Sequence, residues 1–205
     1  MDLLIATHNA HKLAELQAML VDAPFTLRTL ASWPEVPEAP ETGSTFADNA
    51  LQKARFVHAA TGLPTLADDS GLEVDALGGA PGVHSKRFSP EATDAANNAL
   101  LQRKLDGVTH RTARFRCVLA LVTSTWEGTV DGTCEGRIAL APRGGFGFGY
   151  DPLFLPDALD GRTMAEARPE EKNAISHRGR ALAHLPDLLR RAGFVFPTPG
   201  QGPTG

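Results

Sequence analysis

The sequence has few cysteines, no long apolar run and no excess of positive charge. Its two cysteines, Cys117 and Cys134, form no CxxC pair and have no histidine at ligand spacing, so we expect a reduced, cytoplasmic protein without zinc. No apolar run approaches the roughly 20 residues that span a bilayer. The first residues lack the basic segment and cleavage site of a signal peptide. The net charge of −4 argues against a protein that coats nucleic acid or an anionic membrane, so neither partner is expected.

The composition is that of a globular chain large enough to bury an ordinary core. Hydrophobic residues make up 42% and charged residues 21% of the 205 positions, which excludes global disorder. We expect a single domain over residues 1–194. The Pro/Gly-rich tail over residues 195–205 is expected to be disordered.

Apolar patterns and capping signals predict alternating strands and helices. Strands are predicted over 2–7, 64–67, 113–123 and 128–140, the last two as a hairpin. Helices are predicted over 11–21, 45–61, from Ser89 onward, and over 162–191 with a break at 176–179. Thr45 with Asp48 resembles a capping box, and Ser176 is a plausible N-cap. The pattern predicts an α/β fold, in which a mixed sheet carries helices on both faces.

The stretch THNAHK lies where the first predicted strand meets the first predicted helix. Backbone N–H groups and the dipole at a helix N-terminus attract anions, and Lys12 adds a full positive charge. The stretch lacks the glycines of a Walker loop, so it is not that motif. The alternative is that Asn9 caps the helix and Lys12 is a solvated surface residue. The candidate phosphate contacts are Thr7, His8, Asn9, Ala10, His11 and Lys12.

Two adjacent aspartates, Asp68 and Asp69, follow a short apolar run in LADDSG. Mg²⁺ takes one or two carboxylates and leaves its other positions to water and phosphates, so the pair is a candidate metal site. Successive strand side chains point to opposite faces, so one aspartate could hold the metal while the other orients a lysine or the loop. An exposed polar turn is the alternative. Lys53 follows Asn49 by one helical turn, and both could point the same way.

Two later stretches carry groups that suit a nucleoside. Glycines around Phe148 and Tyr150 in GGFGFGYD let the backbone approach a ligand closely, and an aromatic face stacks on a base. In EEKNAISHRG, Arg178 is free to donate hydrogen bonds, and His177 is free to donate or accept them. The alternatives are an aromatic side chain that plugs the core and a helix start with incidental basic residues. With the anion site and the carboxylates, these groups suit a nucleotide and its metal.

Five motifs, in order along nearly the whole chain, resemble the inosine/xanthosine triphosphate pyrophosphatase family. They are THNAHK (7–12), ETGSTFADNALQKA (41–54), ADDSGLEVDALGGAPGVHS (67–85), GGFGFGYDPLF (144–154) and EEKNAISHRGRAL (170–182). The resemblance implies a long central mixed β-sheet and two lobes with an active-site cleft between them. It also implies a Mg²⁺-dependent homodimer that hydrolyses non-standard purine nucleoside triphosphates (ITP, dITP and XTP) to the nucleoside monophosphate and pyrophosphate.

The resemblance also implies roles for individual residues. The stretch 7–12 would hold the triphosphate, Asp69 would be the general base and a metal ligand, and Asp68 would support it. The family often has an acidic pair before the TG of the second motif, whereas this chain has Pro40 and Glu41. Glu41 is therefore the expected second metal ligand, with Glu38 in reserve. The other implied substrate contacts are Lys53, Ser70, Phe148, Gly149, Tyr150, Asp151, Lys172, His177 and Arg178.

Two other functions compete with this hypothesis. A metal-dependent phosphatase or nuclease would also use carboxylates and lysines, but it would release orthophosphate or act on nucleic acid. A nucleotide sensor would bind inosine triphosphate with Mg²⁺ and not hydrolyse it. The products therefore discriminate among the three functions.

Overall fold

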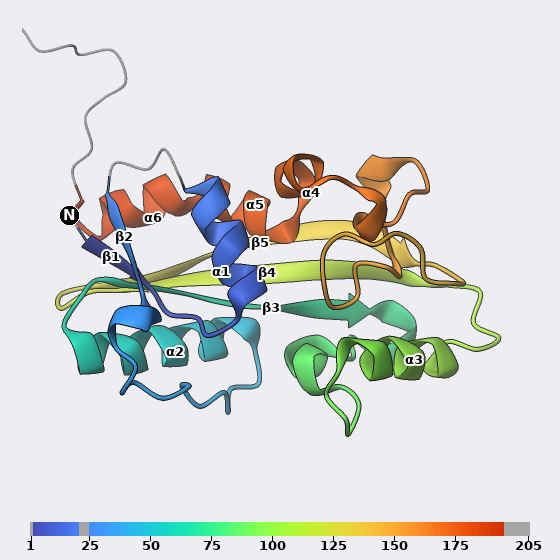
Figure 1. The fold of residues 1–205 in the computed structure, drawn as a ribbon, viewed down its shortest axis with the longest axis horizontal. Coiled ribbons are helices and arrows are strands. Elements are labelled where there is room, and N and C mark those ends of the chain that lie inside the picture. Colours follow the sequence, from blue (N-terminus) through green and yellow to red (C-terminus); the bar gives the residue numbers. More distant parts are fainter. Residues whose placement is uncertain (1, 21–24, 195–205) are drawn as a thin grey trace, which may run out of the picture.

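The computed structural model describes residues 2–20 and 25–194, and its centre is one six-stranded sheet (Figure 1). The strands are β1 (Asp2–Ile5), β2 (Thr26–Thr29), β3 (Thr65–Val74), β4 (Thr112–Val122), β5 (Glu127–Ile138) and β6 (Phe154–Pro156). Their order is β2-β1-β3-β4-β5-β6. Strand β1 is parallel to β2 and β3, whereas the pairs from β3 to β6 are antiparallel. The predicted mixed sheet, with β4 and β5 as a hairpin, is confirmed.

Helices cover both faces of this sheet. They are α1 (Ala10–Met19), α2 (Phe46–Thr61), α3 (Asp94–Lys104), α4 (Pro169–Ile175), α5 (His177–Ala183) and α6 (Leu185–Arg191). The 3₁₀ segments are η1 (Leu30–Ser32), η2 (Asp75–Leu77), η3 (Gly82–Arg87), η4 (Asp157–Leu159) and η5 (Met164–Glu166). Figure 1 shows α1, α4, α5 and α6 on one face and α2 and α3 on the other, which confirms the predicted α/β class. No helix within the described ranges is both long enough and apolar enough to cross a membrane.

The alternation of side chains along β3 divides the core between the two faces. Leu66 packs with Leu119 in a buried cluster that includes residues of α1, α5 and α6. The next residue, Ala67, belongs to a cluster with residues of α2. Burial of a leucine side chain contributes about 1.5–3 kcal/mol, so this register is strongly favoured over a one-residue slip. The register therefore directs Asp68 towards α1 and α5, and Asp69 towards α2.

Side-chain caps begin four of the described helices, α1, α2, α3 and α5. The Thr45 hydroxyl accepts a hydrogen bond from the Asp48 N–H at 3.1 Å and donates one to the Asp48 carboxylate at 2.7 Å. The Ser176 hydroxyl accepts a hydrogen bond from the Gly179 N–H at 3.0 Å. Both predicted caps are therefore confirmed. The Asn9 side chain caps α1, so that part of the alternative for THNAHK is also correct.

The predicted strand over 64–67 is too short, because β3 continues through both aspartates to Val74. In the ladder with β4, Asp68 lies opposite Leu119 and Asp69 lies opposite Val118. Both aspartates are buried, so the alternative of an exposed polar turn is wrong. The sequence DDSG favours a turn locally. Pairing with β4 and the basic side chains that face each carboxylate outweigh that preference.

Two helix predictions need correction. The third helix begins at Asp94 rather than Ser89, because Ala92 has a φ of 50° and Thr93 is the N-cap. Within 162–168 the structure has η5 and an extended Arg168, because Pro169 disfavours helical geometry at the residue before it. The predicted two lobes stay a prediction. The predicted tail over 195–205 lies outside the described residues.

Candidate active site

One pocket gathers most of the residues that the sequence predicts for the site. Its lining includes Thr7, His8, Asn9, Lys12, Glu41, Lys53, Asp69, Ser70, Phe148, Gly149, Tyr150, Asp151, Lys172, His177 and Arg178. Three predicted residues are not part of this lining. Asp68 is buried behind its basic partners, His11 stacks on the Phe148 ring, and Ala10 is exposed at the start of α1. The motifs that are far apart in the sequence therefore do converge.

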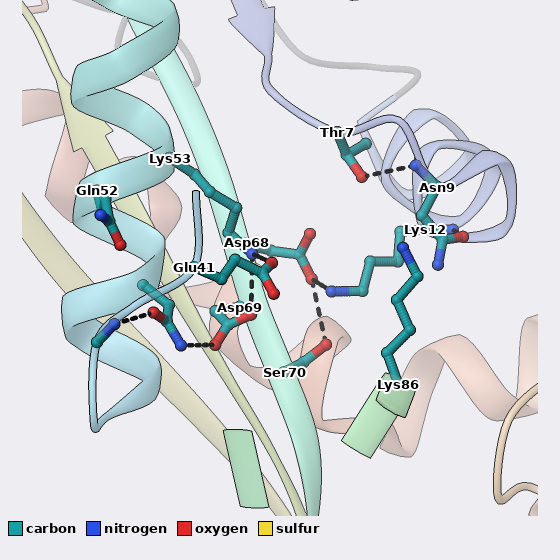
Figure 2. Close-up of polar contacts among 12 residues, drawn as sticks. Thr7, Asn9, Lys12, Glu41, Gln52, Lys53, Asp68, Asp69, Ser70 and Lys86 are labelled. Carbon is teal, nitrogen blue, oxygen red and sulfur yellow. Dashed lines mark hydrogen bonds and ion pairs between the residues drawn. The ribbon is translucent and has the colours of Figure 1, made fainter. Parts of the chain in front are cut away.

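The two aspartates of β3 have different partners, as strand alternation requires (Figure 2). The Asp68 carboxylate lies 3.0 Å from Lys12 Nζ and 3.2 Å from a terminal nitrogen of Arg178. The Asp69 carboxylate accepts a hydrogen bond from Lys53 Nζ at 2.8 Å and one from the Asn49 amide at 3.3 Å. Asp68 thus orients basic groups, and Asp69 faces the other side of the strand.

These surroundings also separate the acidities of the two aspartates. Burial raises the pKa of Asp68, but the charges of Lys12 and Arg178 outweigh it and hold that pKa far below its ordinary value. Burial raises the pKa of Asp69 as well, and there Lys53 offsets it only in part, so the Asp69 pKa lies above its ordinary value. Asp68 therefore holds its negative charge at neutral pH, whereas Asp69 is the better proton acceptor of the two.

Glu41 is brought to the same point as Asp69. Its carboxylate accepts a hydrogen bond from Lys53 Nζ at 2.9 Å, so Lys53 joins it to Asp69. Arg87 holds the other oxygen of Glu41 at 3.2 Å. Figure 2 shows Glu41 and Asp69 directed towards the Lys53 ammonium group. Glu38 instead pairs with Lys86 at 3.3 Å and does not join them.

This pair of carboxylates fits a Mg²⁺ ion better than a metal that needs a full protein cage. Among residues 2–20 and 25–194, no group of three or more His, Cys, Asp or Glu side chains could hold a metal by itself. Mg²⁺ commonly takes one or two carboxylates and completes its shell with water and substrate phosphates. Glu41 and Asp69 supply this number of oxygen ligands beside an anion site.

The start of α1 forms the opposite wall of the pocket. The Asn9 side chain accepts hydrogen bonds from the N–H groups of His11 and Lys12 at 3.0 and 3.2 Å. The Thr7 hydroxyl accepts one from the Asn9 N–H at 3.2 Å. Lys12 is largely buried and paired with Asp68, so the alternative of a solvated surface lysine is wrong. A positively charged corner results, because α1 also points its N-terminus there.

The glycine-aromatic loop, residues 144–150 (GGFGFGY), places the Phe148 ring at the pocket. The His11 ring stacks on Phe148 with centroids 5.1 Å apart, and Lys172 Nζ lies 4.7 Å from the Phe148 centroid. The Asp151 carboxylate accepts hydrogen bonds from the Phe148 N–H at 2.9 Å and from Lys172 Nζ at 2.7 Å. Tyr150 is buried, and its hydroxyl donates to the Ser85 carbonyl at 2.9 Å. Phe148 and Tyr150 both line the pocket, and Tyr150 also packs into the core, as the alternative for this loop predicted.

Sequence reasoning missed Glu15, which connects two of the predicted basic residues. One carboxylate oxygen of Glu15 lies 2.7 Å from Lys172 Nζ, and the other pairs with Arg178. The available signal was its position three residues after Lys12, which places both side chains on the same face of α1. The missed residues Lys86, Asp94 and Asn97 also line the pocket.

His177 and Arg178 are fixed between the sheet and α1. The His177 ring stacks on Phe115 with centroids 4.9 Å apart. Burial, followed by the charges of Arg178 and Lys172, lowers the pKa of His177 well below its ordinary value, so its imidazole is neutral at pH 7. His177 Nδ1 and Arg178 Nε are buried without a hydrogen-bond partner in the described part of the chain. Such groups are candidates for contacts with a ligand.

Comparison with known proteins identifies the family. The family model described as the Ham1 family matches residues 3–188. A dITP/XTP pyrophosphatase of Exiguobacterium sp. is 54% identical over 187 residues, which are 90% of this chain and 95% of that protein. One of Geobacter sulfurreducens is 53% identical over 191 residues, or 91% and 96% of the two chains.

A solved structure agrees with the sequence matches. A HAM1 protein from Coxiella burnetii superimposes with a TM-score of 0.84 at 44% sequence identity, covering 93% of this chain and 99% of that one. The resemblance to triphosphate pyrophosphatases is therefore confirmed in fold and in sequence. Because model, relatives and structure all match along nearly its full length, the chain belongs to the Ham1 family.

Proposed function

We propose that the protein hydrolyses non-standard purine nucleoside triphosphates (ITP, dITP and XTP) to the nucleoside monophosphate and pyrophosphate. One observation carries the proposal: a single pocket joins the Glu41 and Asp69 carboxylates and the start of α1 to an aromatic loop and a neutral imidazole. The carboxylates and the start of α1 suit a triphosphate with its metal, and the aromatic loop and the imidazole suit a purine base. The relatives named dITP/XTP pyrophosphatase add support for the substrate class.

Asp69 is the proposed general base. During hydrolysis Asp69 takes a proton from water while the water oxygen forms a bond to the α-phosphorus. The anhydride bond between the α and β phosphates then breaks. Pyrophosphate leaves with the bonding electron pair. Burial raises the pKa of Asp69, which makes it a stronger base than an exposed aspartate. Lys53 and Asn49 hold the carboxylate in place while Lys12 neutralises phosphate charge.

Glu41 and Asp69 are the proposed Mg²⁺ ligands. Bound there, Mg²⁺ would supply polarisation of the phosphoryl oxygens and neutralise part of their charge. The support is the convergence of both carboxylates on Lys53 Nζ at 2.9 and 2.8 Å. Lys53 would then remain close enough to share these oxygens or to contact a phosphate.

Phe148 and the residues around it are the proposed base site. An aromatic ring stacks on any purine, so selectivity must come from polar groups. Arg178 has donors and no acceptor, which suits the 6-carbonyl of hypoxanthine and xanthine and opposes the 6-amino group of adenine. Its unpartnered Nε–H and the unpartnered His177 Nδ1 have spare hydrogen-bonding capacity. A site that leaves such groups unpaired with the wrong base can discriminate by up to about 10⁴-fold.

We further propose that the protein is a homodimer that acts in the cytoplasm. Resemblance to the family supports the dimer, and light scattering tests it, with a mass twice the 21.8 kDa of one chain expected. The two cysteines are free and buried, which agrees with a reducing compartment.

A panel of purine triphosphates assayed with Mg²⁺ tests the function. Pyrophosphate should appear from ITP, dITP and XTP, and far more slowly from ATP. Orthophosphate as the first product, or cleavage of nucleic acid, would instead identify a phosphatase or nuclease. Tight binding of ITP without any hydrolysis would identify a sensor.

A further inference from the structure

The first turns of α3 hold the backbone of Gly149 at both of its polar groups. The Asp94 carboxylate accepts a hydrogen bond from the Gly149 N–H at 2.7 Å. The Asn98 amide donates one to the Gly149 carbonyl at 2.8 Å and another to the Asp94 carbonyl at 2.8 Å. Two side chains one helical turn apart therefore hold the two peptide groups that flank the Gly149 Cα, an arrangement called the grip below.

These contacts lie beside the Phe148 ring, which the proposed function assigns to stacking on the purine base. Gly149 directly follows Phe148 and has a φ of 63°, a left-handed conformation that glycine adopts without strain. The preceding loop residues 144–147 are exposed, and the N–H groups of Gly145 and Phe146 donate hydrogen bonds to the Ala165 carbonyl at 3.0 Å, so this part of the loop is held from the side away from α3. The Phe148 ring itself contacts His11 and Lys172, whereas its backbone is held by Asp151 and, through Gly149, by the hydrogen bonds from α3.

Helix α3 does not need the Asp94 carboxylate as a cap. Thr93 fills that role, because its hydroxyl accepts a hydrogen bond from the Ala96 N–H at 3.2 Å. A carboxylate in the first turn also favours the helix dipole, but that effect does not require contact with the loop. Asn98 lies on the second turn, where an asparagine is a poor helix former. The contacts with Gly149 give both residues a common role.

We propose that Asp94 and Asn98 are positioning residues that hold Gly149 and thereby keep Phe148 in place for the purine base. The inference rests on the proposed function for its consequence in catalysis. It makes the base end of the pocket depend on α3, whereas the phosphate end depends on α1, α2 and β3. Loss of the grip should therefore weaken binding of the base and leave binding of the phosphates unchanged.

Hydrogen exchange of the nucleotide-free protein tests the grip itself. In Asp94→Ala and in Asn98→Ala, amide exchange of residues 146–150 should be faster by about fivefold or more, because the loop opens more often. Asp94→Asn keeps an acceptor and should retain most of the protection. Asp187→Ala removes a first-turn carboxylate from α6 and should leave the loop unchanged. Unaltered exchange in both α3 variants would overturn the inference.

Kinetics and product inhibition test the consequence for the base. Asp94→Ala should raise KM for ITP about tenfold with kcat within about twofold, since an ordering cost is added to binding. Inhibition by inosine monophosphate should weaken by a similar factor, while inhibition by pyrophosphate should not change. Equal weakening of both inhibitors would show a general structural defect and overturn the role.

A double substitution tests whether Phe148 is the residue through which α3 acts. Phe148→Ala should itself raise KM, and addition of Asp94→Ala should then raise it no further. Independent, multiplying effects would contradict the inference. If the wild-type protein releases no pyrophosphate from ITP, the proposed function fails. The exchange experiment still decides the grip in that case, because it uses no nucleotide.

Discussion

Asp68 and Asp69 are adjacent in the sequence, but their carboxylates point to opposite faces of β3. Repulsion between the two charges is therefore weaker than the attraction of each to its cationic partners. Asp68 meets Lys12 and Arg178, and Asp69 meets Lys53. Each carboxylate thus has its own cationic partners within 3.2 Å. At this scale the ion pairs and the pKa of each aspartate are set by the helices packed on its face of the sheet. The neighbouring aspartate in the sequence has less influence.

Asp69→Asn should keep the shape of the site and remove its proton acceptor. We expect the rate of pyrophosphate release from ITP to fall by about 10²–10⁴-fold, the usual contribution of a general base. The circular dichroism spectrum should match that of the wild type. Asp157→Asn, at an exposed aspartate of η4, is the matched control and should retain activity. A rate near the wild-type value in Asp69→Asn would reject Asp69 as the base.

His177 should make the stability of the fold depend on pH. Burial is the main cause that holds the His177 pKa well below its ordinary value of 6.5. The unfolded chain therefore binds a proton as pH falls below 6.5 and the folded chain does not, so acid favours unfolding. Between pH 7 and 5.5 this single residue should lower the free energy of unfolding by about 1 kcal/mol.

Urea unfolding of His177→Gln at both pH values measures that contribution. The variant should lose about 1 kcal/mol less than the wild type over this interval, whatever its absolute stability. His184→Gln, at an exposed histidine, should keep the pH dependence of the wild type. Identical pH dependence in His177→Gln and wild type would show that His177 binds protons equally in the folded and unfolded states, so that burial does not lower its pKa.

At the scale of elements, the sequence predicted most strands and helices and failed where tertiary contacts override local preference. The caps at Thr45 and Ser176 could be predicted from the sequence, because each capping hydrogen bond joins residues only three positions apart. The length of β3 was not predictable from DDSG, since pairing with β4 and the facing basic residues come from distant segments. The delayed start of α3 at Asp94 likewise depends on the turn at Ala92.

Gly132→Ala tests how closely α5 must approach the sheet. A Cβ at Gly132 of β5 would lie 2.3 Å from the Ala181 nitrogen and 2.3 Å from the His177 oxygen, both of them backbone atoms of α5. The helix would have to move away, which should cost about 1–3 kcal/mol of stability. Because α5 carries His177 and Arg178, KM for ITP should rise as well.

Thermal unfolding and steady-state kinetics together measure this effect. Asp131→Ala, at the exposed neighbouring position of β5, should change neither quantity appreciably. Wild-type stability and KM in Gly132→Ala would mean that α5 tolerates displacement and does not need this close approach.

At the scale of the whole molecule, the pocket draws on both faces of the sheet. Motifs that carry their own chemistry, such as THNAHK and SHRG, could be predicted as site residues, and most of them line one pocket. Glu15 and Asp94 could not be assigned in the same way, because their roles exist only in contacts between separate elements. The five motifs predict which residues lie together in the pocket. The contacts that hold those residues in place can be identified only once the fold is known.

A ligand that touches α1, α2, β3, α5 and the glycine-aromatic loop at once should stabilise the entire fold. We expect a dITP analogue with an imido bridge between the α and β phosphates to bind the folded state with Mg²⁺ and not to be cleaved. At 100 times its dissociation constant it should add about 2.7 kcal/mol to the free energy of unfolding. For a chain of this size, that corresponds to a rise of roughly 5–10 °C in Tm.

Differential scanning calorimetry measures the shift under three conditions. The inosine analogue with Mg²⁺ should give the full rise, and chelation of Mg²⁺ should remove most of it, because Glu41 and Asp69 then repel the phosphates. The adenine analogue at the same concentration should give a much smaller rise, since its 6-amino group meets donors. Equal shifts for the two bases would reject base recognition in this pocket. An equal shift with and without Mg²⁺ would reject Glu41 and Asp69 as metal ligands.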